Sequence, residues 1–100
     1  MLAIARFTVP LAEASLFSRE IEVARSVLSG RDGYISGEAG RNCDDPTLWV
    51  LMTSWKDVGS YRRALGSMEV KMQAIPLLAR AIDEPGAYDN VDAGDLQLRP

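Results

Sequence analysis

The sequence predicts a single α+β domain built from four strands and a few helices. Three observations support this prediction. The chain has 100 residues, of which 47% are hydrophobic and 25% charged, as expected for a globular domain with one core. Apolar residues recur at helical spacing in some stretches and form short strand-like runs in others. Turn-forming residues, mainly proline and glycine, separate these stretches and mark where the elements end.

The N-terminal part begins with a predicted strand over residues 2–9, which ends at Pro10. Both faces of this strand are mostly apolar, which is typical of a strand that is covered on both sides. A helix is expected over residues 13–28, because apolar residues recur along one of its faces. These residues are Phe17, Ile21, Ala24 and Leu28. Gly30 is expected to end the helix as a left-handed C-cap.

Two further strands are predicted in the middle of the chain, over residues 33–42 and 47–55. Gly37 and Gly40 indicate a bulge in the first of them, on a curved sheet; the alternative is the close approach of a ligand. The turn between the strands contains Asp45-Pro46. Because this connection is short, the two strands are expected to pair antiparallel.

The C-terminal part is predicted to be helical up to residue 82. Asp57 opens a helix that runs to residue 65, and Ser67 is placed to cap a second one. Pro76 must kink or split that second helix, because it removes an amide donor. A fourth strand is expected over residues 87–91, which completes a domain of residues 1–91.

Residues 92–100 are predicted to be a C-terminal tail outside this domain. The order of elements is therefore β-α-β-β-α-(α)-β, with a four-stranded antiparallel sheet. This is the ferredoxin-like split β-α-β pattern.

The apolar residues of the predicted strands also indicate a homodimer. The strand over residues 47–55 carries Leu48, Val50 and Met52 on one face and Trp49, Leu51 and Trp55 on the other. Helices cover only one face of such a sheet, and monomers rarely expose a contiguous apolar patch. We therefore expect two copies to pack through their sheet faces and form a dimeric α/β barrel.

Composition excludes several classes of function. The net charge of −3 gives no field that attracts phosphate backbones, so no nucleic-acid partner is expected. The chain has no histidine, which removes the commonest metal ligand and general base. Cys43 is the only cysteine and fits a reducing, cytoplasmic location. The longest uncharged run, residues 46–55, is about half of what a membrane span needs, so no membrane association is expected.

Residues 2–91 resemble the antibiotic biosynthesis monooxygenase family, which belongs to the dimeric α/β-barrel superfamily. The resemblance rests on the order and spacing of several residues rather than on one motif. These are Pro10 at the end of the first strand, Phe17, Gly33, Asp45-Pro46, Trp55, Tyr61 and Ser67.

The resemblance implies a small-molecule cleft between the sheet and the helices. Trp55 matches a pocket tryptophan of monooxygenase members, and Tyr61 matches a pocket tyrosine of some of them. Such enzymes oxidise electron-rich aromatic substrates with molecular oxygen and use no metal or flavin. The implied logic is that the deprotonated substrate itself reduces oxygen, while the protein binds, orients and stabilises an anion.

This chain departs from the family at informative positions. Leu51 stands four residues before Trp55, where some active members carry asparagine. Ala5 stands where haem-degrading members carry asparagine in the first strand, and the haem-ligating histidine is missing as well. Haem degradation by the family mechanism is therefore excluded.

We expect substrate contacts from an aromatic and apolar set, namely Trp55, Tyr61, Phe7, Leu51 and Met72. No residue can be assigned a catalytic role, and no metal or cofactor is expected. The adjacent carboxylates Asp44-Asp45 and Asp83-Glu84 lie beside prolines in predicted turns and are expected to face solvent.

Three functions stay open at this point. The first is a cofactor-independent monooxygenase of a small aromatic or quinol-type metabolite. The second is a non-enzymatic barrel that binds a small apolar ligand or a partner protein. The third is a structural dimer without a pocket. A fold of this kind hosts many functions, so it does not decide among them.

Overall fold

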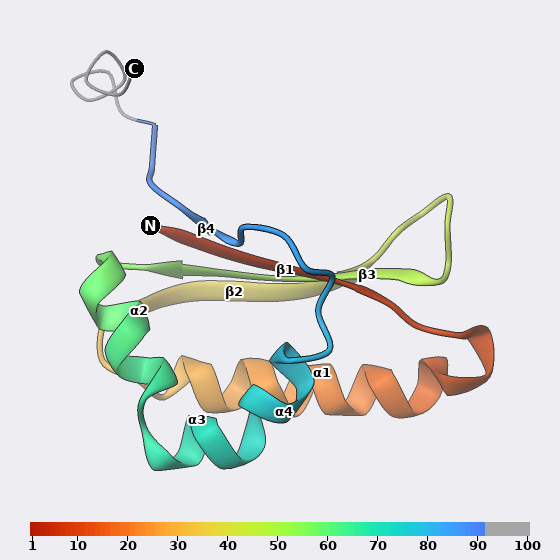
Figure 1. The fold of residues 1–100 in the computed structure, drawn as a ribbon, viewed down its shortest axis with the longest axis horizontal. Coiled ribbons are helices and arrows are strands. Elements are labelled where there is room, and N and C mark those ends of the chain that lie inside the picture. Colours follow the sequence, from red (N-terminus) through yellow and green to blue (C-terminus); the bar gives the residue numbers. More distant parts are fainter. Residues whose placement is uncertain (92–100) are drawn as a thin grey trace.

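The computed structural model describes residues 1–91 and shows a four-stranded antiparallel sheet with all helices on one face (Figure 1). The elements in chain order are β1 Leu2–Thr8, the short 3-10 helix η1 Leu11–Glu13, α1 Ala14–Ser29, β2 Tyr34–Arg41, β3 Leu48–Trp55, α2 Val58–Leu65, α3 Met68–Gln73, α4 Ile75–Leu78 and β4 Ala87–Tyr88. The strand order is β2-β3-β1-β4, and every neighbouring pair is antiparallel. The predicted ferredoxin-like α+β fold is confirmed. The tail predicted over residues 92–100 lies outside the described residues.

The core lies between α1 and the sheet. The four apolar residues predicted on one face of α1, Phe17 to Leu28, are all buried. The Phe17 ring packs against Phe7 of β1 and Trp49 of β3, with ring centroids 5.2 and 5.3 Å apart. Paired residues in adjacent strands share a face, so the register of β1 and β3 places Phe7 beside Trp49. The apolar face of α1 and the helix-facing side of the sheet therefore pack together in one aromatic cluster.

The turn after α1 differs from the prediction. Gly30 has a φ of −86°, so it is not a left-handed cap. The left-handed residue is Gly33, with a φ of +87°, and it is the only residue of the described chain with positive φ. A Cβ at Gly33 would lie 2.4 Å from the Ser60 side chain, so glycine also allows α2 to pack against this turn. The position of the left-handed residue thus reflects the packing of this turn against α2, which is distant in sequence, rather than the end of α1.

The irregularity in β2 also lies earlier than expected. The pairing of β2 with β3 shifts between Tyr34 and Ser36, whereas Gly37 and Gly40 are in regular register. Gly37 leaves room for its neighbours, because a Cβ there would lie 2.4 Å from the Tyr34 hydroxyl, 3.0 Å from the Thr53 methyl and 3.1 Å from the Met52 carbonyl oxygen. The close approach that a strand glycine indicates is made here by a side chain of the same strand.

The caps and the break in the C-terminal helices are as predicted. The Asp57 carboxylate accepts a 2.7 Å hydrogen bond from the Ser60 amide at the start of α2, which lowers the Asp57 pKa. The Ser67 hydroxyl accepts from the Val70 amide at the start of α3. Ala74 separates α3 from α4, and Pro76 lies in the first turn of α4. Three short helices therefore follow β3 and lie on the same face of the sheet as α1 (Figure 1).

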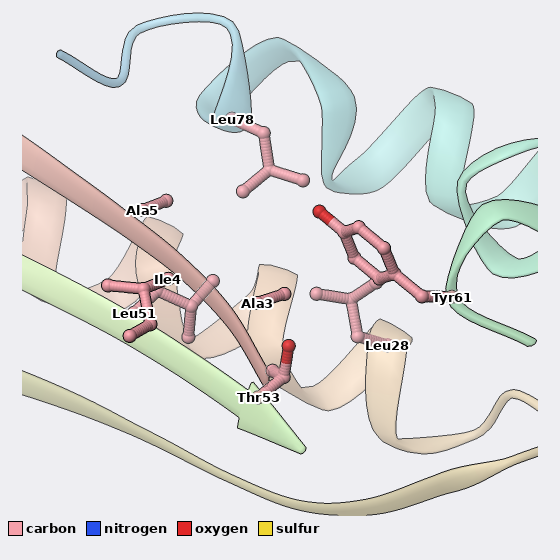
Figure 2. Close-up of a pocket in the computed structure, with 8 residues that line it drawn as sticks. All are labelled: Ala3, Ile4, Ala5, Leu28, Leu51, Thr53, Tyr61 and Leu78. Atoms are coloured by element: carbon pink, nitrogen blue, oxygen red, sulfur yellow. The ribbon is translucent and has the colours of Figure 1, made fainter. Parts of the chain in front are cut away.

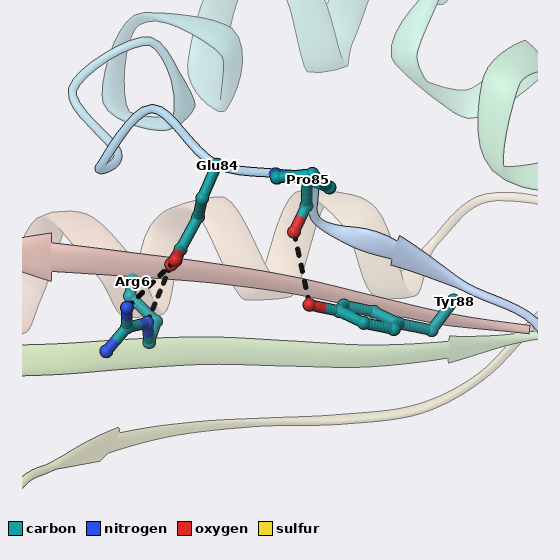
Figure 3. Close-up of polar contacts among 4 residues, drawn as sticks. All are labelled: Arg6, Glu84, Pro85 and Tyr88. Atoms are coloured by element: carbon teal, nitrogen blue, oxygen red, sulfur yellow. Dashed lines mark hydrogen bonds and ion pairs between the residues drawn. The ribbon is translucent and has the colours of Figure 1, made fainter.

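The second face of the sheet carries no helix in the described chain (Figure 1). Five apolar side chains of β1 and β3 lie on this open face and are only half-buried: Leu2, Ile4, Leu48, Val50 and Met52. Arg6 lies in the same row and forms a two-pronged ion pair with Glu84, at 2.6 and 2.8 Å (Figure 3). This pair lowers the pKa of Glu84. Nearby, the Tyr88 hydroxyl donates a 3.2 Å hydrogen bond to the Pro85 carbonyl (Figure 3).

Candidate functional site

A small cavity lies between the helix-facing side of the sheet and the helices, at the end of β3 (Figure 2). Its volume is about 30 Å³. It is lined by Ala3, Ile4, Ala5, Leu28, Leu51, Thr53, Tyr61 and Leu78. Residues from β1, β3, α1, α2 and α4 thus meet around one space. Sheet register explains part of this set, because Ala3 pairs with Thr53 and Ala5 with Leu51 on the same face.

Among residues 1–91, two hydroxyls are the only polar side-chain groups that line the cavity. Thr53 is 2% exposed, and its Oγ1 accepts a 2.8 Å hydrogen bond from Nε1 of Trp55. The Tyr61 hydroxyl projects towards Leu78 and makes no hydrogen bond within the described chain (Figure 2). Burial raises the pKa of Tyr61 above its usual value of 10.0. Tyr61 therefore stays protonated at neutral pH and can donate a hydrogen bond.

Trp55 lies beside the cavity rather than in its lining. Its side chain is 1% exposed and is held between Tyr34 and Tyr61, with ring centroids 5.4 and 5.5 Å away. It reaches the cavity indirectly, through the hydrogen bond to Thr53 and the contact with Tyr61. Trp55 thus supports both hydroxyl-bearing residues of the cavity.

The other residues expected to contact a substrate are spread over the fold. Leu51 lines the cavity next to Ala5. Phe7 is buried in the aromatic cluster with Phe17 and is not among the lining residues. Met72 is 70% exposed on α3 and does not line the cavity. The structure therefore brings Tyr61 and Leu51 together at the cavity, with Trp55 behind them.

Most of the lining residues were not among those predicted from the sequence. Leu78 comes from α4, the short helix that follows the break at Ala74. Ala3 and Ala5 are small residues in β1, and their role is to leave room beneath the helices. Arg62 and Lys71, the basic residues that follow Trp55 on the helices, are exposed and do not line the cavity. Among the described residues, the cavity therefore offers hydroxyl donors and apolar surface, without a charged side chain.

A second, more open groove of about 630 Å³ runs along the opposite flank of α1. Its lining consists of Ser18, Arg19, Ile21, Glu22, Val23, Ala39 and Trp49. The groove shares no residue with the Tyr61 cavity. The buried Trp49 Nε1 has no hydrogen-bond partner within the described chain. This groove contains none of the residues that the sequence analysis placed near a substrate.

No group of three or more histidine, cysteine, aspartate or glutamate side chains in residues 1–91 is arranged to hold a metal ion. In the same part of the chain, no helix is both long enough and apolar enough to cross a membrane.

Comparison with known proteins identifies the family. Residues 1–72 match the family model described as antibiotic biosynthesis monooxygenase. No functionally curated protein matches the chain. The three solved structures described next are less than 25% identical to it, so their likeness concerns the fold.

One such structure is a point variant of SnoaB, a cofactor-independent oxygenase from Streptomyces nogalater. It has a TM-score of 0.70 and 23% identity, over 81% of this chain and 82% of that one. Rv0793 from Mycobacterium tuberculosis has a TM-score of 0.71 and 17% identity, over 91% and 94% of the two chains. A conserved protein from Methanosarcina mazei Go1 has a TM-score of 0.69 and 20% identity, over 86% and 84%.

The family match covers most of the chain, from β1 to within α3, and includes Thr53, Trp55 and Tyr61. The ferredoxin-like topology of residues 1–91 agrees with it. The chain therefore belongs to the antibiotic biosynthesis monooxygenase family.

Proposed function

We propose that this protein is a cofactor-independent monooxygenase that acts on a small aromatic or quinol-type metabolite bound between the sheet and the helices. The observation that supports this most is the cavity beside Trp55, in which the hydroxyls of Thr53 and Tyr61 meet apolar walls. A neutral tyrosine hydroxyl is suited to stabilise an oxygen anion on a substrate. SnoaB, a cofactor-independent oxygenase, shares the fold, which is consistent with this chemistry.

The proposed reaction takes its electrons from the substrate. Loss of a proton from an acidic phenol or quinol gives an electron-rich anion, which transfers electrons to dioxygen. One oxygen atom becomes a carbonyl on a ring carbon, and the other leaves as water with the hydrogen of that carbon and the hydrogen of the ionised hydroxyl. The hydroxyls hold the substrate oxygen while negative charge develops, and the apolar walls exclude water. No carboxylate or amine lines the described cavity, so we expect the proton to pass to solvent.

Substrate binding requires the cavity to widen. A volume of about 30 Å³ has room for about one or two water molecules, whereas ligand sites usually enclose roughly 300–1,000 Å³. Tyr61 and Leu78 come from α2 and α4, which have eight and four residues. We expect this wall of short helices to move outward on binding, since α1 and the sheet form the aromatic core.

The proposal includes a homodimer formed through the open faces of two sheets. Leu48, Val50 and Met52 lie on that face and are only half-buried in the single chain. A second copy would cover this apolar row, and two four-stranded sheets would then form the dimeric α/β barrel. Arg6 lies in the same row and already forms an ion pair with Glu84, so burial would not leave either charge unpaired.

A cytoplasmic location is also part of the proposal. Cys43 is the only cysteine in the sequence and is exposed as a free thiol, which fits a reducing compartment. The partners that we expect are a small-molecule substrate and a second copy of the chain. We expect no nucleic-acid partner and no membrane association.

A second candidate function is a non-enzymatic barrel that binds a small apolar ligand. Leu51 favours this alternative, because it lines the cavity where some active family members carry asparagine. An apolar side chain cannot donate or accept a proton there. Under this alternative, the same cavity binds a ligand but promotes no reaction with oxygen.

Titration with hydroxylated polycyclic aromatics and quinols distinguishes the two functions. Tryptophan fluorescence reports binding, and an oxygen electrode reports turnover in buffer with a metal chelator. The monooxygenase predicts quenching together with protein-dependent oxygen uptake, which Tyr61→Phe lowers. Tyr88→Phe is the matched control, because it removes a hydroxyl outside the cavity. Quenching without uptake would favour the binding barrel, and neither signal would contradict both.

A further inference from the structure

We propose that Thr53 is the hydrogen-bond donor that holds the substrate oxygen in this cavity, and that Trp55 is a positioning residue that acts through Thr53. The indole N–H of Trp55 can only donate, and it donates to Thr53 Oγ1 at 2.8 Å. Thr53 must therefore use a lone pair for Trp55, and its hydroxyl hydrogen points elsewhere. Within the described residues, the Thr53 hydroxyl donates no hydrogen bond. This inference rests on the site of the proposed function.

Packing fixes the direction of the Thr53 side chain. Its methyl group lies against Gly37 of β2, where an added Cβ would approach it to 3.0 Å. A β-branched side chain has one torsion that places both methyl and hydroxyl, so packing the methyl over β2 also sets the hydroxyl. The hydroxyl then points into the space below Tyr61 and Leu78 (Figure 2). Gly37, Thr53 and Trp55 thus form one arrangement across two strands.

The cavity consequently presents two hydroxyls that can each donate a hydrogen bond to a ligand. Thr53 uses one lone pair to accept from Trp55, which leaves its hydrogen for a ligand, and Tyr61 is protonated. A buried donor without an acceptor is unfavourable, so a ligand that supplies an acceptor oxygen gains from both groups. A carbonyl, phenolate or enolate oxygen meets this requirement, whereas a ligand without oxygen does not. The substrate class is therefore narrowed to rings that carry an acceptor oxygen and place it between the two hydroxyls.

The probe for this arrangement is para-nitrophenol, whose phenolate absorbs visible light away from the protein. Its pKa when bound, measured by absorbance at saturating protein, reports how well the site stabilises an oxygen anion. We expect Thr53→Val to raise this bound pKa by about one unit relative to the wild type, and to weaken phenolate binding about tenfold. Thr53→Ser keeps the hydroxyl and the hydrogen bond from Trp55 but not the methyl, so it should restore most of the wild-type shift. Trp55→Phe should raise the pKa by a smaller amount than Thr53→Val, because packing still places the Thr53 oxygen while Trp55 no longer directs its hydrogen towards the ligand.

A double variant separates this role from a structural one. Thr53→Val alone leaves the buried Trp55 N–H without a partner and is expected to destabilise the fold. Thr53→Val combined with Trp55→Phe removes both partners, so stability should recover while the bound pKa stays high. Equal bound pKa values in the wild type and Thr53→Val would overturn the proposal, as would failure of the wild type to bind para-nitrophenol. Oxygen uptake is a separate readout: its absence with the pKa difference intact would reject the oxygenase but retain the Thr53 donor.

Discussion

The indole N–H of Trp55 donates a 2.8 Å hydrogen bond to the hydroxyl of Thr53, two residues earlier in β3. Because side chains two apart share one face of a strand, both residues lie on the helix-facing side of the sheet. Thr53 lines the cavity, whereas Trp55 stands behind it against Tyr34 and Tyr61. The tryptophan that the family resemblance places in the pocket is therefore, in this chain, a buried support for the pocket's polar groups.

Replacing Trp55 should test this supporting role through stability. Trp55→Ala is expected to lower the free energy of unfolding by about 3–5 kcal/mol, because it removes a fully buried aromatic side chain. Trp55→Phe should cost about 1–3 kcal/mol, since the ring contacts are largely kept while Thr53 loses its donor. Urea denaturation measures both values. An Ala variant as stable as the wild type would show that Trp55 is not part of the core.

Gly33 should tolerate substitution poorly. Gly33→Ala is expected to lower the free energy of unfolding by about 1–3 kcal/mol, because the positive φ is strained for alanine and the new methyl meets Ser60. Gly66→Ala is the matched control, since Gly66 has an ordinary φ of −84° and its nearest neighbour to an added Cβ lies at 3.5 Å. Thermal unfolding of the two variants compares them directly. Equal melting temperatures would contradict the contact between this turn and α2.

The raised pKa of Tyr61 predicts a difference in stability at alkaline pH. Burial favours the neutral phenol in the folded state, so the folded pKa lies above the unfolded value of about 10. The folded state then binds more protons than the unfolded state between these two values, and stability falls as the pH rises through that range. Tyr61→Phe removes this group, so its stability should fall less than that of the wild type above about pH 10. Parallel slopes for the two proteins would contradict burial of the phenol.

The dimer proposal predicts that a charged substitution disrupts the dimer on the open face of the sheet but not on the exposed side of α1. Val50→Asp or Leu48→Asp should convert the dimer to a monomer, because each places a charge in the apolar row of the open face. Val23→Asp is the matched control, since Val23 is 50% exposed on α1 and distant from that face. Sedimentation velocity measures the assembly. A dimer that survives both changes on the open face would reject association through the sheets.

Elements whose signals are local could be predicted from the sequence. The stripe from Phe17 to Leu28 defined α1, and the side chains of Asp57 and Ser67 marked the starts of α2 and α3. The left-handed position of the turn was predicted at Gly30 but lies at Gly33. The sequence near the turn does not reveal this, because Gly33 packs against Ser60, which is distant in sequence. The bulge was misplaced for a similar reason, since Gly37 accommodates the Tyr34 side chain.

The site was harder to predict from the sequence than the fold. Tyr61 and Leu51 were placed near a pocket through the resemblance, and both line the cavity. Leu78 reaches the cavity only because the chain breaks at Ala74 and restarts as α4. Met72 was difficult to place, because α3 has six residues and buries Val70, which leaves Met68 and Met72 exposed. The direction of a short helix depends on its neighbours, and sequence periodicity does not report it.

The most direct test of the central claim is the fate of the two oxygen atoms of dioxygen. The protein would be incubated under isotopically labelled dioxygen, in chelator-treated buffer, with the hydroxylated aromatics and quinols that quench its fluorescence, and the products analysed by mass spectrometry. A cofactor-independent monooxygenase predicts a protein-dependent product that carries one labelled oxygen atom, at a rate that Tyr61→Phe lowers. Tight binding of these compounds without any labelled product would contradict the account.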